Sequence, residues 1–261
     1  MRENIYCELQ ADKVKEDLKQ GNREDGRKLD EYRKIKVEKN ISENANGSCR
    51  IFLGETRVSV GVKFELMTPY PDSPDAGTMM VGFEFLPLAS PSFELGPPRI
   101  ESIELSRVVD RGLRESKTID FKKLCLEEGS KVFGVLVDGY IENDEGNLFD
   151  AASLASIIAL ANTKFPKLDS EYKFVKKEFA GMLKLNEKPI MMTFGKIYDK
   201  IIVDPNLSET IALDARLSIA VTEKNVISAM QKGLAGSFSK EEVLECIDLA
   251  FEKAKELRKL F

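Results

Sequence analysis

The chain contains no histidine. This absence excludes Ser-His-Asp and Cys-His nucleophiles, metal sites built from histidine, and the most common general base of enzymes. Any catalysis by this chain must therefore rest on carboxylates, lysines, arginines or a partner.

Cysteine pairs and long apolar runs are also missing. The four cysteines, Cys7, Cys49, Cys125 and Cys246, are isolated and form no CxxC spacing. No apolar stretch is long enough for a signal peptide or a membrane span. We therefore expect reduced thiols, a cytoplasmic location and no membrane association.

Basic residues are also outnumbered by acidic ones. Lysine and arginine total 39 against 44 acidic residues, which gives a net charge of -5 and a pI of about 5.2. The common phosphate-binding motifs GxxxxGK[ST] and GxGxxG are absent. We therefore expect no nonspecific binding of nucleic acid over the whole surface, so any binding of anions must be local.

The composition is that of a soluble globular protein. Hydrophobic residues make up 43% of the 261 residues, which is enough for a sizeable core in one large domain or in two fused halves. After a short helix at 10–20, alternating apolar residues predict strands at 48–54, 56–66 and 78–88. The Pro- and Gly-rich loop 67–77 predicts that the last two of these strands pair as neighbours.

The second half of the sequence repeats this order of elements. A strand at 131–143, a turn at 144–147 and a buried helix at 148–165 are followed by a hairpin at 189–205 and by strands at 216–222 and 225–233. The last helix has Ser239 as its N-cap and Glu242 as the partner in a capping box. The pattern predicts an α+β (two-layer α/β) fold of two pseudo-duplicated halves in one domain. It has a lead-in at 1–24, a first half at 25–125 and a second half at 126–261.

A basic stripe is predicted on the helix that follows Pro97 and Pro98. Its members recur at helical spacing, with Asp110 and Glu115 to either side, and apolar residues line the opposite face. The stripe consists of Arg107, Arg111, Arg114 and Lys117, and the apolar face of Leu105, Val108, Val109 and Leu113. A solvated outer face is the simpler explanation. Repulsion between like charges four residues apart, however, favours an anionic partner that offsets it.

Two acidic segments are candidates for chemistry. Asp144-Glu145-Gly146-Asn147 leads into a helix N-terminus, where free N–H groups can hold an anion, but its two acidic residues favour an ordinary turn. Asp204, Glu209 and Asp214 could form a carboxylate cluster for a divalent metal or for acid/base catalysis. Their spacing matches no metal loop, and Asp204-Pro205 is typical of a turn. A structural role is therefore favoured for this segment, and Asp214 is the residue in it that most needs testing for a catalytic role.

Several segments together resemble the RNase PH family of phosphorolytic exoribonucleases, in particular its non-catalytic members in the archaeal exosome ring. In order they are DGRKLDEYRKIKVE, GETRVSVGVKFEL, RVVDRGLRESKTIDF, VLVDGYIENDEGNLFDAASLAS and VDPNLSETIALDARLSIAV. They extend from about residue 25 to the C-terminal helix.

The resemblance implies two related β/α halves and a ring in which three catalytic and three non-catalytic subunits alternate around a channel. RNA in that channel is shortened from its 3′ end by inorganic phosphate, which the catalytic partner uses. By position, the family's channel-facing arginines correspond to Arg107, Arg111 and Arg114, with Lys117 beside them. Backbone contacts of this kind bind single-stranded RNA of any sequence.

The departures from the family pattern indicate an inactive subunit. Catalytic members carry a Gly-Ser/Thr-Arg element for the attacking phosphate, whereas this chain has Gly146-Asn147-Leu148 with two acidic residues upstream. Asp214 matches the catalytic carboxylate and would then be a relic or a structural residue.

Three hypotheses remain open at this point. The leading one is a non-catalytic RNA-binding subunit that needs no cofactor or metal of its own and completes the active site of its partner. The second is an active phosphorolytic or metal-assisted exoribonuclease that uses Asp214. The third is a relative with no RNA role. The sequence does not tell whether RNA-binding cap proteins sit on the ring.

Overall fold

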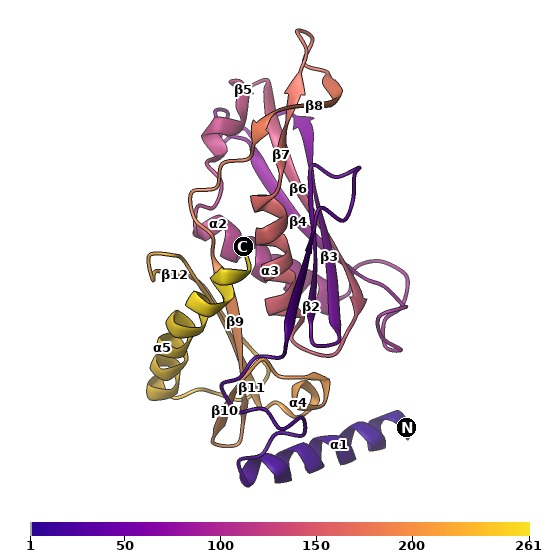
Figure 1. Ribbon diagram of the computed structural model, residues 1–261, viewed down its shortest axis with the longest axis vertical. Helices are drawn as coiled ribbons and strands as arrows, with labels where there is room; N and C mark the ends of the chain where they lie inside the picture. Colours follow the sequence, from indigo (N-terminus) through magenta and orange to yellow (C-terminus); the bar gives the residue numbers. More distant parts are fainter. Residues whose placement is uncertain (1) are drawn as a thin grey trace.

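The computed structural model describes residues 2–261, with side chains from residue 9 onward. Two β-sheets, in which most neighbouring strands are antiparallel, form the body of the molecule (Figure 1). The larger sheet has the order β1-β2-β3-β6-β4, with β5 added beside β6. Its strands are β1 (Ile35–Lys39), β2 (Gly47–Leu53), β3 (Thr56–Met67), β4 (Thr78–Phe85), β5 (Cys125–Glu127) and β6 (Lys131–Asn143).

The smaller sheet is formed by the C-terminal part of the chain. It has four antiparallel strands in the order β10-β9-β11-β12. They are β9 (Ile190–Ile197), β10 (Lys200–Val203), β11 (Ala215–Val221) and β12 (Ile227–Gly233). The predicted hairpin at 189–205 and the last two predicted strands are thus confirmed. A separate hairpin of β7 (Lys164–Leu168) and β8 (Phe174–Met182) follows the strands of the large sheet along the chain and precedes those of the small sheet.

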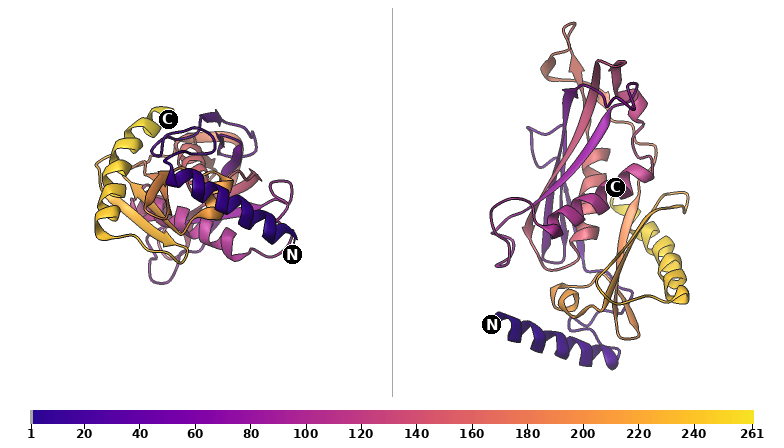
Figure 2. Two further views of the ribbon diagram at one scale, coloured as in Figure 1. Left: turned by 90° about the horizontal axis from the view of Figure 1, so that it is seen from below. Right: turned by 180° about the vertical axis from the view of Figure 1, so that it is seen from behind.

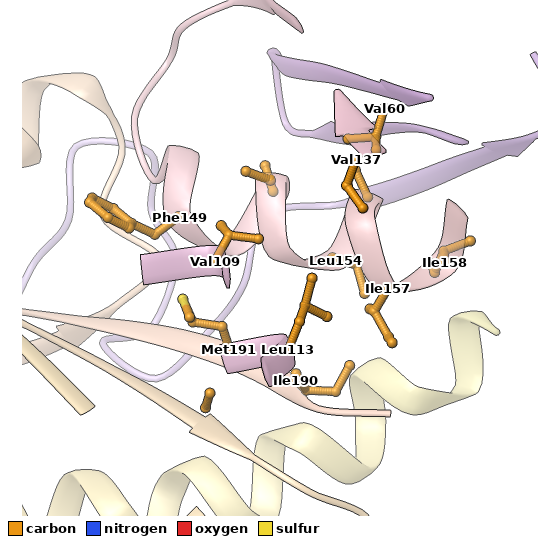
Figure 3. Packing of buried hydrophobic residues seen from close by; sticks show 14 of the residues in the cluster. Val60, Val109, Leu113, Val137, Phe149, Leu154, Ile157, Ile158, Ile190 and Met191 are labelled. Carbon is orange, nitrogen blue, oxygen red and sulfur yellow. The ribbon is translucent and has the colours of Figure 1, made fainter. Parts of the chain in front are cut away.

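The helix α3 (Leu148–Ala161) is the centre of the core. It packs on β2 and β3 of the large sheet, on β9 of the small sheet and on α2 (Ile100–Glu115). Figure 3 shows Leu154 and Ile157 of α3 among side chains from these neighbours. Twelve of its 14 residues are buried, because it lies between two layers of the protein. This confirms the buried helix expected from its apolar and small residues.

Three further α-helices pack around the small sheet. They are α1 (Arg2–Lys19), α4 (Leu207–Ala212) and α5 (Lys240–Leu257). The short 3-10 helices Phe121–Leu124 and Arg258–Leu260 lie beside β6 and at the end of α5. The capping box of Ser239 and Glu242 is present at the start of α5. Val14 and Leu18 of α1 pack near α4 on Ile197, Ile202 and Ala212.

The structure corrects several sequence expectations. β3 and β4 are not neighbours: β6 lies between them, antiparallel to β3 and parallel to β4. The strand at 131–143 thereby joins the sheet of the first half, while the division after residue 125 stays a prediction. The first helix is longer than residues 10–20, and the helix expected to reach 165 ends at Ala161. Lys164 and Phe165 instead begin β7.

Candidate nucleic-acid interface

The predicted arginines belong to α2, which lies in front of the large sheet in Figure 2 (right). Arg107 and Arg111 are exposed, while Val109 and Leu113 on the opposite face are buried against the core. Arg107 has no hydrogen-bond or ion-pair partner among the side chains that the structure describes, and Arg111 donates only to Gln231 Oε1 at 3.2 Å. Both guanidinium groups can therefore take an anionic ligand without breaking an ion pair.

Arg114 and Lys117 differ from this pair. Arg114 donates from Nε and Nη2 to the carboxylate of Asp110 at 3.0 and 2.8 Å, and from Nη2 to the carbonyl of Met79 at 2.7 Å. Its hydrogen bond to Asp110 raises the pKa of Arg114 above the ordinary value. Arg114 therefore has an acidic partner, whereas Arg107 and Arg111 have none among the described side chains. Lys117 lies beyond the last helical residue with φ +54°, and its side chain is exposed.

Two surface hollows flank Arg107. One, of about 400 Å³, lies toward β4 and β6 and is lined by Arg107, Ser106, Asp138 and Tyr140 among others. The other, of about 300 Å³, lies toward β12 and is lined by Arg107, Arg111 and Gln231 among others. Arg107 thus stands on a ridge between two places where a bulky ligand can lie.

The turn at 144–147 is held by hydrogen bonds within the turn and to Thr56. Gly146 and Asn147 have φ of +86° and +54°, and the side chain of Asp144 accepts from the Gly146 N–H at 3.0 Å. The Glu145 N–H donates to Thr56 Oγ1 at 3.1 Å, and the carbonyl of Gly146 accepts from Thr56 at 2.8 Å. The N–H groups of Glu145 and Gly146 thus donate to protein atoms, as in an ordinary turn.

A cavity of about 200 Å³ lies at the N-terminus of α3. Its lining includes the carboxylates of Glu101, Glu104 and Asp144 and one cation, Arg216. Arg216 forms an ion pair with Glu104 and stacks on Phe149, with its guanidinium carbon 4.1 Å from the ring centroid. Burial raises the pKa of Asp144. An inorganic phosphate at this place would meet three carboxyl groups and an arginine that is already paired.

Asp214 does not line this cavity, although Leu213 and Arg216 do. Its Oδ2 accepts from the backbone N–H of Tyr198 at 2.7 Å, and its Oδ1 lies 3.7 Å from Lys15 Nζ. Tyr198 has φ +53° at the turn between β9 and β10. Asp214 therefore stabilises a tight turn and links it to α1.

A buried ionic network was missed by the sequence analysis. Asp204, fully buried, accepts from Arg33 Nη2 and Nε at 2.7 and 2.9 Å, from Arg27 Nη1 at 3.0 Å and from Asn147 Nδ2 at 2.8 Å. Burial by itself would raise the pKa of Asp204, but the hydrogen bonds and charge of Arg33 outweigh it, and the pKa is lowered. Glu209 pairs with Arg23 in the same region.

This network gives the acidic segment a structural role. Asp204 and Glu209 hold the arginine-rich segment 23–33 against β10 and α4. Among the side chains described, no group of three or more carboxylates and cysteines is arranged to hold a metal ion. The only sequence signal for the network is the recurrence of arginine in DGRKLDEYRK, and that signal names no partner.

Two family models cover most of the chain. The first domain of the 3′ exoribonuclease family matches residues 31–166, and its second domain matches residues 188–253. The chain belongs to the RNase PH family of 3′ exoribonucleases. The resemblance and the mixed α/β fold expected from it are confirmed.

Curated members of the RNase PH family are similar along almost the whole chain. The exosome complex component Rrp42 of Thermococcus gammatolerans is 45% identical over 98% of this chain and 95% of its own. The protein of the same name from Methanothermobacter thermautotrophicus is 43% identical over 97% and 94%.

Solved RNase PH structures have the same arrangement. A chain of the Archaeoglobus fulgidus exosome with RNA bound to the active site superimposes with a TM-score of 0.90 at 40% identity, covering 98% of both chains. A chain of an archaeal exosome core gives a TM-score of 0.88 at 37% identity over 99% and 98%. No helix in the described residues of this RNase PH protein is long and apolar enough to cross a membrane.

Proposed function

We propose that this chain is the Rrp42-type, non-catalytic subunit of an archaeal exosome ring. The observation that carries the proposal is the separation of charge between two places on the surface. The outward face of α2 presents two cations with no acidic partner among the described side chains, whereas the cavity at the N-terminus of α3 is lined by three carboxyl groups, those of Glu101 and Glu104 from the start of α2 and of Asp144 from the turn before α3. The first arrangement binds a polyanion, and the second repels the phosphate that phosphorolysis needs.

In this role α2 holds the RNA backbone. Arg107 and Arg111 contact phosphates directly, and Arg114 and Lys117 extend the positive field along the helix. These contacts are independent of sequence, as a degradation channel requires. Because an exposed guanidinium binds a phosphate in a bidentate manner, two such groups also fix the position of the strand.

Catalysis belongs to a partner subunit of the same fold, with which this chain alternates in a six-membered ring. The partner supplies the site for inorganic phosphate, and this chain completes the RNA-binding surface beside it. The exposed apolar residues around the start of α2 support such an interface, because a monomer gains nothing from leaving them in water. Leu95, Ile100 and Ile103 are 85%, 81% and 45% exposed.

The state of the cysteines fits work in the cytoplasm. Cys49 and Cys246 are free and buried, and burial raises the pKa of each thiol to about 12, which keeps both protonated and unreactive. Cys125 is also free, and Cys7 lies outside the described side chains. Reduced thiols of this kind are typical of intracellular proteins.

The test is an RNA decay assay in phosphate buffer. This chain alone, the catalytic partner alone and the mixed, ring-sized fraction are compared for release of nucleoside diphosphates from single-stranded RNA. We expect the mixed ring to be the most active and this chain alone to release none. Release of nucleoside diphosphates by this chain alone would disprove the proposal.

A further inference from the structure

The β7–β8 hairpin lies largely in the segment that joins the two matched family domains. The first match ends at residue 166, and the second begins at residue 188. It projects from the end of the molecule opposite α1 (Figure 1). Phe165 anchors its base, because the ring lies 4.9 Å from the rings of both Phe64 and Phe133.

The hairpin is basic on an acidic protein. Residues 164–184 contain six lysines and three acidic residues, a formal charge of +3, which leaves -8 for the rest of a chain whose total is -5. Lys167 pairs with Glu178 and Lys173 with Glu171. The other four hairpin lysines make no ion pair with any described side chain. They are Lys164, Lys176, Lys177 and Lys184.

One face of the hairpin combines one of these cations, Lys164, with exposed apolar atoms. Lys164 is opposite Met182, and Pro166 is opposite Phe179, with a register shift between the two pairs. The contact of Lys164 with Phe179 places both pairs on one side of the hairpin. Phe179 and Met182 are 45% and 52% exposed, and Lys164 Nζ lies 5.2 Å from the centre of the Phe179 ring. Phe165, next along β7, points the other way into the core.

We propose that the exposed hairpin, with Lys164 and Phe179 together on one face and Lys176 and Lys177 exposed on the same strand as Phe179, is a second binding surface for single-stranded RNA. The inference rests on the proposed function and extends it. Unpaired lysines beside a half-exposed aromatic ring are what proteins use to bind single strands without regard to sequence: the cations follow the phosphates and a base stacks on the ring. A protein partner is disfavoured, because the cores of protein interfaces are depleted in lysine.

The segment that follows the hairpin is hydrogen-bonded to the end of α2. The Asn186 N–H donates to the carbonyl of Thr118 at 2.9 Å, and Asn186 Nδ2 donates to the carbonyl of Lys117 at 3.3 Å. The chain that leaves β8 therefore passes the last basic position of the α2 stripe. An RNA held on α2 must be longer than the α2 face to reach the hairpin as well.

Length dependence provides the test. Binding of oligouridines of increasing length to the assembled ring is measured over a range of salt concentrations. The variants are Lys176→Glu with Lys177→Glu, and separately Phe179→Ala. Lys255→Glu, at an exposed position of α5, is the matched charge control.

We expect short oligouridines to bind all variants equally. For long ones, the double lysine variant should lower the salt slope by roughly 1.4, because each phosphate that is no longer neutralised accounts for about 0.7. Phe179→Ala should weaken binding of long oligouridines by about fivefold, the lower end for removal of a base stack. Since these sites are exposed, thermal unfolding should be unchanged.

Two outcomes would overturn the proposal. One is unchanged binding of oligouridines of every length by a complex that has kept all its proteins. The other is unchanged RNA binding together with loss of a protein from the complex, which would make the face a protein-docking surface. Failure of the proposed function is distinguishable, since it would show as full binding of short oligouridines by variants of α2.

Discussion

Arg23 and Glu209 form a bidentate ion pair that is almost completely enclosed. Nε donates to Oε1 at 2.7 Å and Nη2 donates to Oε2 at 2.6 Å, with 0% and 1% of the two side chains exposed. Arg23 also donates to the carbonyls of Val203 and Asp204 at 3.0 and 2.9 Å. The pair therefore attaches the lead-in segment to β10 and α4.

Removing one member of this pair should be costly. Glu209→Gln leaves the Arg23 charge buried and uncompensated, and we expect the free energy of unfolding to fall by about 3 kcal/mol or more. Urea unfolding of the purified chain measures it. Glu16→Gln, which breaks the exposed pair of Glu16 and Lys19, is the control and should change stability by less than about 0.5 kcal/mol. Equal losses in the two variants would show that the buried pair contributes little.

Local patterns predicted the elements well, and pairing over long distances poorly. Alternating apolar residues predicted strands where β3 and β4 occur, and the periodicity of α2 predicted its buried face. Such patterns say which side of a strand is buried and not which strand lies beside it. The insertion of β6 between β3 and β4 was missed for that reason.

The candidate site shows the same limit. Arg23 and Glu209 are 186 residues apart, and no periodic signal connects them. The pairing of Asp110 with Arg114 is different, because residues four apart on a helix are neighbours and the sequence carries that information. The hairpin escaped notice because register shifts and the positive φ of Lys177 break its alternation.

The two unpaired arginines of α2 should contribute most to RNA binding. Arg107→Ala with Arg111→Ala, measured on the assembled ring with short oligouridines, should lower the salt slope by roughly 1.4, about 0.7 per phosphate neutralised. Arg114→Ala should have a smaller effect, since that guanidinium is bound to Asp110 and Met79. Lys255→Ala is the control. If Arg114→Ala proved the most damaging of these changes, the assignment of the free cations would be wrong.

Asp214 distinguishes a structural subunit from an enzyme. Asp214→Asn keeps an oxygen that accepts from the Tyr198 N–H, so we expect the mixed ring to degrade RNA at the rate of the original protein. Asp214→Leu should lower the thermal midpoint, because the turn at Tyr198 loses its acceptor. A large drop in turnover for Asp214→Asn, with unchanged stability and assembly, would support the alternative of catalysis through Asp214.

Gly146 should tolerate no side chain. At φ +86°, a Cβ atom would lie 2.4 Å from the carbonyl carbon of Asn206 and 2.6 Å from the nitrogen of Leu207, both backbone atoms of the segment that leads into α4. We expect Gly146→Ala to destabilise the protein by about 2 kcal/mol or more in urea unfolding. Gly82→Ala is the control, since nothing lies within 4 Å of its Cβ position. Equal stability of both variants would mean that the two segments can move apart freely.

Asp150 should make stability depend on pH. Burial raises the pKa of Asp150 to about 6, even though its Oδ2 accepts from Tyr32, Asn147 and Thr193 at 2.7, 2.9 and 3.1 Å. Its Oδ1 accepts no hydrogen bond, so this oxygen can carry the proton.

The sign of the effect follows from proton binding. In the unfolded chain the pKa of an aspartate is about 3.9, so between about pH 4 and 6 the folded state holds a proton that the unfolded state has released. Stability from this group therefore falls as pH rises through that window and stays low above it. Asp150→Asn removes the titration, so the stability of the variant relative to the original protein should rise across the same window.

The size of that rise should be about 3 kcal/mol, since each pH unit between the two pKa values corresponds to about 1.4 kcal/mol. The lowered pKa of Asp204 acts in the opposite direction, and because Asp204 is present in both proteins, most of its contribution cancels. Urea unfolding at a series of pH values measures the difference between the two proteins. A constant difference across the window would show that Asp150 is ionised in the folded protein throughout.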